Sequence, residues 1–202
     1  MLRHMVKAVV LLLVVHTGAL HAQSPFGMEL RGGAAIPAAD LGDASLKTGF
    51  STEVTGTFRV MEQLNVYAGW DWSRFATDTP FYGSNYDVEL TGYAFGLQFQ
   101  HPLASRMGGW LRAGALYSHV ELENTAGTTV ADSGHELGWE VGGGLRVPVG
   151  ERTFITPGVR YRTLSTELTV GQVRSIDLSY IAAEVGVAWT FGSKRPATVT
   201  SR

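Results

Sequence analysis

The sequence predicts an all-β fold, an eight-stranded antiparallel up-and-down transmembrane β-barrel. Segments of alternating apolar and polar residues recur along the chain, and period two is the repeat of a β-strand. The 202 residues include 25 glycines and no cysteine, so neither a disulfide nor a thiolate–metal scaffold is available. After the N-terminal region no segment reaches 18 consecutive apolar residues, which argues against a helical span.

The clearest predicted strand covers residues 179–191. One face of this segment is wholly apolar and ends in two aromatic residues: Ile181, Ala183, Val185, Val187, Trp189 and Phe191. The other face is small or polar: Ala182, Glu184, Gly186, Ala188 and Thr190. A strand that separates lipid from a narrow polar lumen has this pattern.

Earlier segments share this alternation and complete the count of eight. They are residues 26–36, 50–60, 64–73, 88–100, 110–122, 137–147 and 155–162. The connections alternate between short turns and longer loops, the latter predicted at residues 37–46, 76–87, 123–135 and 164–174. Short turns at one end and long loops at the other are typical of transmembrane barrels, whose long loops face outside. These loops are rich in Asp and Glu, which predicts an acidic outer rim.

The N-terminus predicts a secretory signal peptide. Arg3 and Lys7 precede an apolar run over residues 8–15 that is too short to span a membrane, and small residues lead to a cleavage site before Gln23. The predicted regions are a signal peptide at 1–22, a barrel domain at 23–192 and a flexible periplasmic tail at 193–202.

The polar faces of the strands predict a network of charges in the lumen. Its members are Glu29, Arg31, Glu53, Arg59, Asp71, Arg112, Glu140, Arg146, Arg160, Arg162 and Glu184. Charges in a narrow interior should pair, because an unpaired buried charge is costly. An eight-stranded barrel is just wide enough for side chains to fill. We therefore favour a filled lumen over a charged conduit for small ions.

Outward aromatic residues near the strand ends predict interfacial girdles: Trp70, Trp72, Phe99, Tyr117, Trp139, Tyr161, Trp189 and Phe191. The alternative is a soluble lipocalin-like barrel or sandwich with the apolar face inside. Solvated strand faces usually carry lysine, and beyond the signal peptide the chain has only Lys47 and Lys194. This scarcity favours the membrane barrel.

The last strand carries a terminal motif of the form polar, any, Gly, any, any, aromatic, any, aromatic, which is formed by Glu184, Gly186, Trp189 and Phe191. With this motif and the strand order, the region from Phe26 to Phe191 resembles the porin-like outer membrane protein β-barrel domain family of small eight-stranded OmpA/OmpX-type proteins. The resemblance implies a place in the Gram-negative outer membrane, contact with its lipids and lipopolysaccharide, and recognition by the barrel-assembly machinery. The motif usually ends the chain, whereas eleven residues follow Phe191 here.

No catalytic residue, cofactor or metal site is predicted. Ser118 and His119 are the nearest approach to a nucleophile and base, but adjacent strand residues point to opposite faces. His101 and His135 are expected to be solvated, and their spacing matches no metal motif. The formal net charge of −2 gives no reason to expect a nucleic-acid partner.

The expected function is that of a non-enzymatic surface protein whose loops contact external partners. Some small outer-membrane barrels modify lipid A with His and Ser, so a lipid A-modifying enzyme is kept as a possibility. A narrow pore for small solutes or ions is the alternative, and a lipid A-modifying enzyme is the third possibility.

Overall fold

The computed structural model describes residues 25–39, 45–77, 86–104, 107–124, 126–170 and 172–191, and they contain nine strands. The strands are β1 (Phe26–Pro37), β2 (Gly49–Met61), β3 (Leu64–Ala76), β4 (Tyr86–Ala104), β5 (Met107–Asn124), β6 (Thr129–Asp132), β7 (Glu136–Pro148), β8 (Thr153–Val170) and β9 (Gln172–Thr190). Pro25–Thr190 form one compact unit. The described residues include no helix long and apolar enough to cross a membrane. The predicted signal peptide and tail lie outside the described residues.

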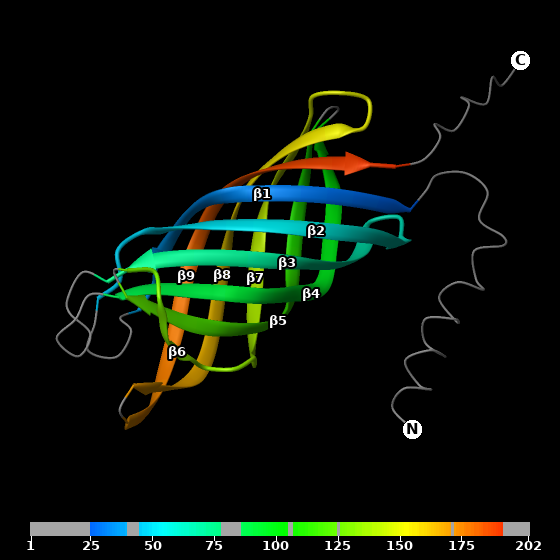
Figure 1. The fold of residues 1–202 in the computed structure, drawn as a ribbon. Coiled ribbons are helices and arrows are strands. Elements are labelled where there is room, and N and C mark those ends of the chain that lie inside the picture. Colours follow the sequence, from blue (N-terminus) through cyan, green and yellow to red (C-terminus); the bar gives the residue numbers. More distant parts are fainter. Residues whose placement is uncertain are drawn as a thin grey trace, which may run out of the picture. The chain divides into compact units, whose positions relative to one another are not determined.

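Eight of these strands close into an antiparallel barrel, which confirms the predicted fold (Figure 1). The sheet order is β4-β3-β2-β1-β9-β8-β7-β5, and β4 also pairs with β5 to complete the ring. The first and last strands pair from Gly27 with Thr190 to Pro37 with Tyr180. Closure leaves no sheet edge in the ring, as a strand structure in lipid requires.

Two of the predicted loops are wrong, because each contains strand structure. Within 123–135, β6 forms a ninth strand that pairs with the end of β5 and lies outside the ring. Within 164–174, β8 and β9 continue as a hairpin that pairs as far as Val170 with Gln172. Leu164 of β8 and Ile176 and Leu178 of β9 are buried on the inward face, opposite to the outward apolar residues of the predicted strands. A search for outward apolar residues therefore passes over them.

The direction of the alternation reverses along the barrel. We call the end with the β2–β3 and β7–β8 turns the turn end, and the opposite end the loop end. Near the loop end the inward side chains form an apolar cluster, called here the apolar cap: Ala35, Phe75, Val88, Leu90, Val120, Leu122, Leu164, Ile176, Leu178, Tyr180 and Ala182. Nearer the turn end the inward side chains are mostly polar and the outward ones are apolar.

The reversal marks where the barrel leaves the membrane. A strand needs about 9–11 residues to cross a bilayer, whereas β4, β5, β8 and β9 have 18 or 19 residues each. Outward residues beyond the aromatic positions are polar or charged, for example Glu89, Glu121 and Asp177. The barrel is therefore built as a membrane protein over one part of its height and as a soluble barrel over the other.

Candidate functional site

The most distinctive chemistry of the molecule is a set of charged side chains that crosses the barrel interior below the apolar cap. We call this set the charge layer: Glu53, Asp71, Arg112, Glu140, Arg160, Arg162 and Glu184. They come from β2, β3, β5, β7, β8 and β9, so six of the eight barrel strands contribute. None is more than 4% exposed. The alternation of each strand turns these side chains inward.

Each arginine of the layer contacts at least two carboxylates. Arg112 Nη1 lies 2.8 Å from Glu53 Oε1, and Arg112 Nε donates to Glu140 Oε1 at 2.8 Å. Arg162 joins three acids, since it lies 2.7 Å from Asp71, 2.8 Å from Glu53 and 2.8 Å from Glu140. Arg160 contacts Glu184 at 2.6 Å and also pairs with Glu53.

Hydroxyl groups around the layer donate further hydrogen bonds to its carboxylate oxygens. Tyr67 Oη donates to Glu140 at 2.7 Å, and Ser51 Oγ donates to Glu184 at 2.5 Å. The Arg112 guanidinium also lies 4.2 Å from the centre of the Tyr67 ring. Hydrogen bonding and ring contact thus fix the orientation of charges that pairing alone would leave adjustable.

A second pair lies closer to the turn end. Arg31 contacts Glu29 at 2.7 Å and donates to the Thr156 carbonyl at 3.2 Å. Its guanidinium stacks over the ring of Trp110, which is 1% exposed. A side chain at Gly158 would collide with this ring. The glycine therefore makes room for an indole that packs against the inner wall of the barrel.

Two predicted members of the network stand apart from the others. Arg146 donates to Gln100 at 2.8 Å and stacks over Phe154, at the edge of a cavity of about 400 Å³ at the turn end. Arg59 is exposed near the end of β2, so it is not one of the buried charges, and its place on the inner face stays a prediction. Its position close to the β2–β3 turn accounts for this exposure, because the barrel mouth is open to solvent there.

The predicted girdle residues all lie on the outward face, at two heights. Trp70 is directly opposite Tyr93, and Tyr93 is opposite Tyr117, which makes an aromatic row across three strands. The rings of Trp139 and Tyr161 pack 5.4 Å apart, and those of Phe50 and Trp72 6.5 Å apart. The remaining members lie toward the turn end: Phe99, Trp189 and Phe191. In the terminal motif, Glu184 and Gly186 face inward while the two aromatic residues are exposed.

Sequence reasoning missed the inward Trp110 and the whole apolar cap. A signal for the cap was present in β4, where the apolar positions Val88 and Leu90 are even-numbered but Tyr93 and Phe95 are odd-numbered. The same shift occurs in β9 between Leu178 and Ile181. A change of parity within one continuous strand indicates that the apolar face changes sides.

Ser118 and His119 lie on opposite faces, as the alternation predicts. Ser118 is 0% exposed and faces the interior, whereas the imidazole of His119 lies on the outer surface beside Glu121, with 3.4 Å between His119 Nε2 and Glu121 Oε1. The two side chains therefore do not form a nucleophile–base pair.

Comparison with known proteins relates the chain to membrane barrels. The family described as outer membrane protein beta-barrel domain matches residues 8–191. Similar solved structures are Neisserial surface protein A (18% identity, 85% of this chain and 100% of that chain, TM-score 0.60) and OprG from Pseudomonas aeruginosa (13%, 85% and 96%, 0.53). The solid-state NMR structure of AlkL is also similar (14%, 89% and 96%, 0.52). A comparison with curated protein sequences found no match.

Proposed function

Since the chain belongs to the outer membrane protein beta-barrel domain family and is located in the outer membrane, we propose that it is a non-enzymatic barrel with a sealed lumen that acts through its external surface. Members of this family have diverse roles, so the interior and surface of this chain must supply the argument. The charge layer is the observation that carries the proposal.

The charge layer supports a sealed lumen because its side chains are held by one another. Moving Arg160 or Arg162 aside to admit an ion would separate each from at least two carboxylates. Breaking a buried ion pair by removing one partner costs about 3–5 kcal/mol. Displacing an arginine would break several such contacts at once, so thermal motion opens this layer rarely.

The apolar cap supplies a second barrier above the charges. Phe75, Leu90 and Leu122 are each at most 1% exposed and belong to one cluster inside the loop half. An ion that entered from the loop end would have to leave water for a dry apolar interior, which is costly. The two barriers are different in chemistry, and a permeant solute would have to cross both.

Planar-bilayer recording of the purified barrel tests the sealed lumen. We expect no stable openings on the nanosiemens scale, with a porin of about 16 strands as the positive control for the measurement. Such openings at a frequency that follows the amount of this barrel would contradict the proposal.

A narrow pore remains the second candidate because of the cavity at the turn end. It measures about 400 Å³ and is lined by Gln100 and Arg146, among others. A smaller space of about 20 Å³, which shares these two residues, reaches Trp110. That volume is about enough for one water molecule. The space therefore narrows toward Trp110, which favours a closed mouth over a conduit.

A lipid A-modifying enzyme is the third candidate and has less support. Because Ser118 and His119 face opposite sides of the wall, a reaction would need another nucleophile. Lipid A should show the same acylation pattern in cells that carry the wild type, the His119→Ala variant or a deletion. A change in acylation on deletion that the wild type restores would contradict the non-enzymatic proposal.

The proposed surface role rests on the part of the barrel beyond the aromatic row. Its outward face carries charged groups, including Arg74, which lies 2.8 Å from Asp87 and 3.0 Å from Glu123. The hydrogen bond to Asp87 raises the pKa of the Arg74 guanidinium, which stays charged. Lipopolysaccharide and external partners would meet this mixed polar wall, and the barrel-assembly machinery would meet the terminal strand during biogenesis.

A further inference from the structure

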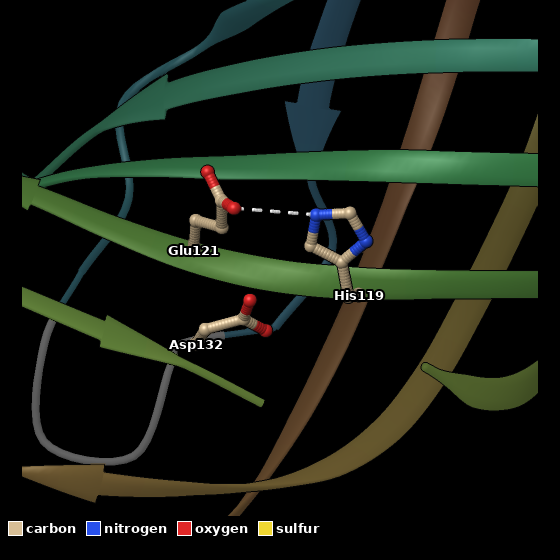
Figure 2. A group of neighbouring side chains, drawn as sticks. All are labelled: His119, Glu121 and Asp132. Atoms are coloured by element: carbon tan, nitrogen blue, oxygen red, sulfur yellow. Dashed lines mark ion pairs between the residues drawn. The ribbon is translucent and has the colours of Figure 1, made fainter. Parts of the chain in front are cut away.

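A cluster of possible metal ligands lies on the outer wall of the loop half, away from the lumen. His119 and Glu121 are two residues apart on β5 and therefore share its outward face, and Asp132 lies on β6 next to them (Figure 2). One ligand atom from each residue lies within 4.8 Å of the others. Sequence patterns did not indicate this site, because a loop was expected where β6 adds the third side chain.

The strand register places like charges directly opposite one another at this point. Glu89 on β4 is paired with Glu121 on β5, and Glu121 is paired with Asp132 on β6. Like charges in directly opposite positions destabilise a sheet. At the β4 end of this row, Arg74 lies 3.9 Å from Glu89 and compensates its charge. A cation between Glu121 and Asp132 would relieve the repulsion at the other side.

The imidazole of His119 is oriented for such a role. Its Nε2 faces Glu121 at 3.4 Å, while its Nδ1 lies 3.3 Å from Nε2 of His135. The His119 and His135 rings are 4.6 Å apart, and His135 also packs 4.9 Å from Tyr117. A histidine that binds metal through one nitrogen is commonly held by a hydrogen bond at the other. His135 provides that bond here.

The turn that follows Asp132 holds one of its two carboxylate oxygens by a hydrogen bond. Its Oδ1 accepts a hydrogen bond from the backbone N–H of Gly134 at 2.8 Å, and Gly134 has a φ of 69° that suits glycine. Ser133 ties the same segment to β5 by a 2.9 Å hydrogen bond from Val120 N. The second carboxylate oxygen of Asp132 is then available to a ligand.

We propose that His119 Nε2, Glu121 and Asp132 bind a divalent transition-metal cation of the Zn²⁺ class and that His135 positions His119. One imidazole with two carboxylates is a donor set that suits Zn²⁺ better than Ca²⁺ or Mg²⁺, which prefer oxygen ligands alone. Zinc–ligand bonds of about 2.0–2.2 Å put tetrahedral ligand atoms about 3.3 Å apart. The side chains must therefore close by about 1.5 Å at most, which the partly exposed Glu121 and the exposed Asp132 can do by rotating. The fourth position is left to water.

The bound ion would fasten β6 to the barrel. In the described residues β6 is the last strand of the sheet order and pairs on one side with β5. A metal that joins Asp132 to two β5 residues would hold this edge strand in place. This consequence gives the test a second readout.

Zinc titration by calorimetry tests the proposal on the mature barrel, purified without a polyhistidine tag and refolded in detergent. We expect one Zn²⁺ per barrel, undiminished by excess Mg²⁺. His119→Ala should abolish the site, and His135→Ala should weaken it by about 10–100-fold. The matched control is His101→Ala, because His101 stacks on Phe99 near the turn end.

Two results would overturn the proposal: an absence of stoichiometric zinc binding by the wild type, or equal affinity in wild type and His119→Ala. Heat-modifiable migration in gels checks that each variant is folded. The wild type alone provides an additional measurement, because Co²⁺ in a site of this kind should give visible absorption bands. Zinc should also slow proteolysis within residues 126–135, and unchanged cleavage at saturating zinc would count against a link between β6 and β5.

Discussion

At the scale of single residues, the interior depends on Glu53. Its carboxylate pairs with Arg112, Arg160 and Arg162, and Glu140 is the other carboxylate of the charge layer that contacts all three arginines. These two glutamates hold the guanidinium groups close to one another. Removing either charge would leave several buried cations insufficiently compensated, which is more harmful than the loss of an exposed pair.

Glu53→Ala should destabilise the barrel by about 3–5 kcal/mol. The measurement is the urea unfolding curve of the refolded barrel in detergent or lipid. Glu62→Ala is the matched control, because Glu62 is exposed in the β2–β3 turn and its loss should change stability by no more than about 0.5 kcal/mol. Equal unfolding midpoints for the two variants would show that the charge layer contributes little to stability.

At the scale of single strands, each long strand has two apolar faces in succession. In β4, Val88 and Leu90 point inward within the apolar cap, whereas Phe95 and Leu97 point outward. Both arrangements follow from the same period-two geometry, and only the surroundings differ. Where lipid surrounds the wall, apolar residues face out, and where water surrounds it, they face in.

This arrangement explains how much of the fold the sequence could predict. The eight strands, their order and the inward direction of Glu53, Arg160 and Glu184 follow from alternation, because a polar residue in a membrane strand has only the lumen as a favourable side. The pairing partners do not follow, since Arg162 meets Asp71 from a strand that is distant in sequence. Likewise His119 and Asp132 come together only through β6, a four-residue strand too short to show a period.

Leu90→Ala should cost about 2–5 kcal/mol, because Leu90 is 1% exposed and its loss leaves a cavity in the apolar cap. Leu103→Ala makes the same change on the same strand, at a side chain that is 59% exposed. We expect the control to unfold at the wild-type denaturant concentration. A control that is destabilised as much as Leu90→Ala would argue against a dry, packed loop half.

At the scale of the whole molecule, closure of the ring by β1 and β9 joins the two ends of the sheet. The two strands pair over eleven positions from Gly27 to Pro37. Strands that are adjacent in sequence form most of the other pairs, whereas the β1–β9 pair needs nearly the whole chain to be in place. A covalent link across this seam would therefore report a completed barrel.

Ala34→Cys combined with Ala183→Cys should form a disulfide in the folded barrel, since the two residues are directly opposite each other and the chain has no other cysteine. The bond would be seen as a faster band in a non-reducing gel after full denaturation. Ala34→Cys with Ala115→Cys is the control, because Ala115 lies on β5 and pairs with Phe95 and Trp139. Linkage of the control pair in monomers, or none in the first, would refute the β1–β9 register.

The reversal of the apolar face along the strands has a consequence for the position of the barrel in the bilayer. A slip of four residues toward the turn end, about 13 Å along a strand, would carry Glu89 and Glu121 into the level now occupied by Tyr93 and Tyr117. A slip the other way would expose the aromatic row to water. Both movements are unfavourable. The sequence therefore sets a single depth of immersion, and everything displayed beyond Tyr117 stands at a fixed height above the lipid.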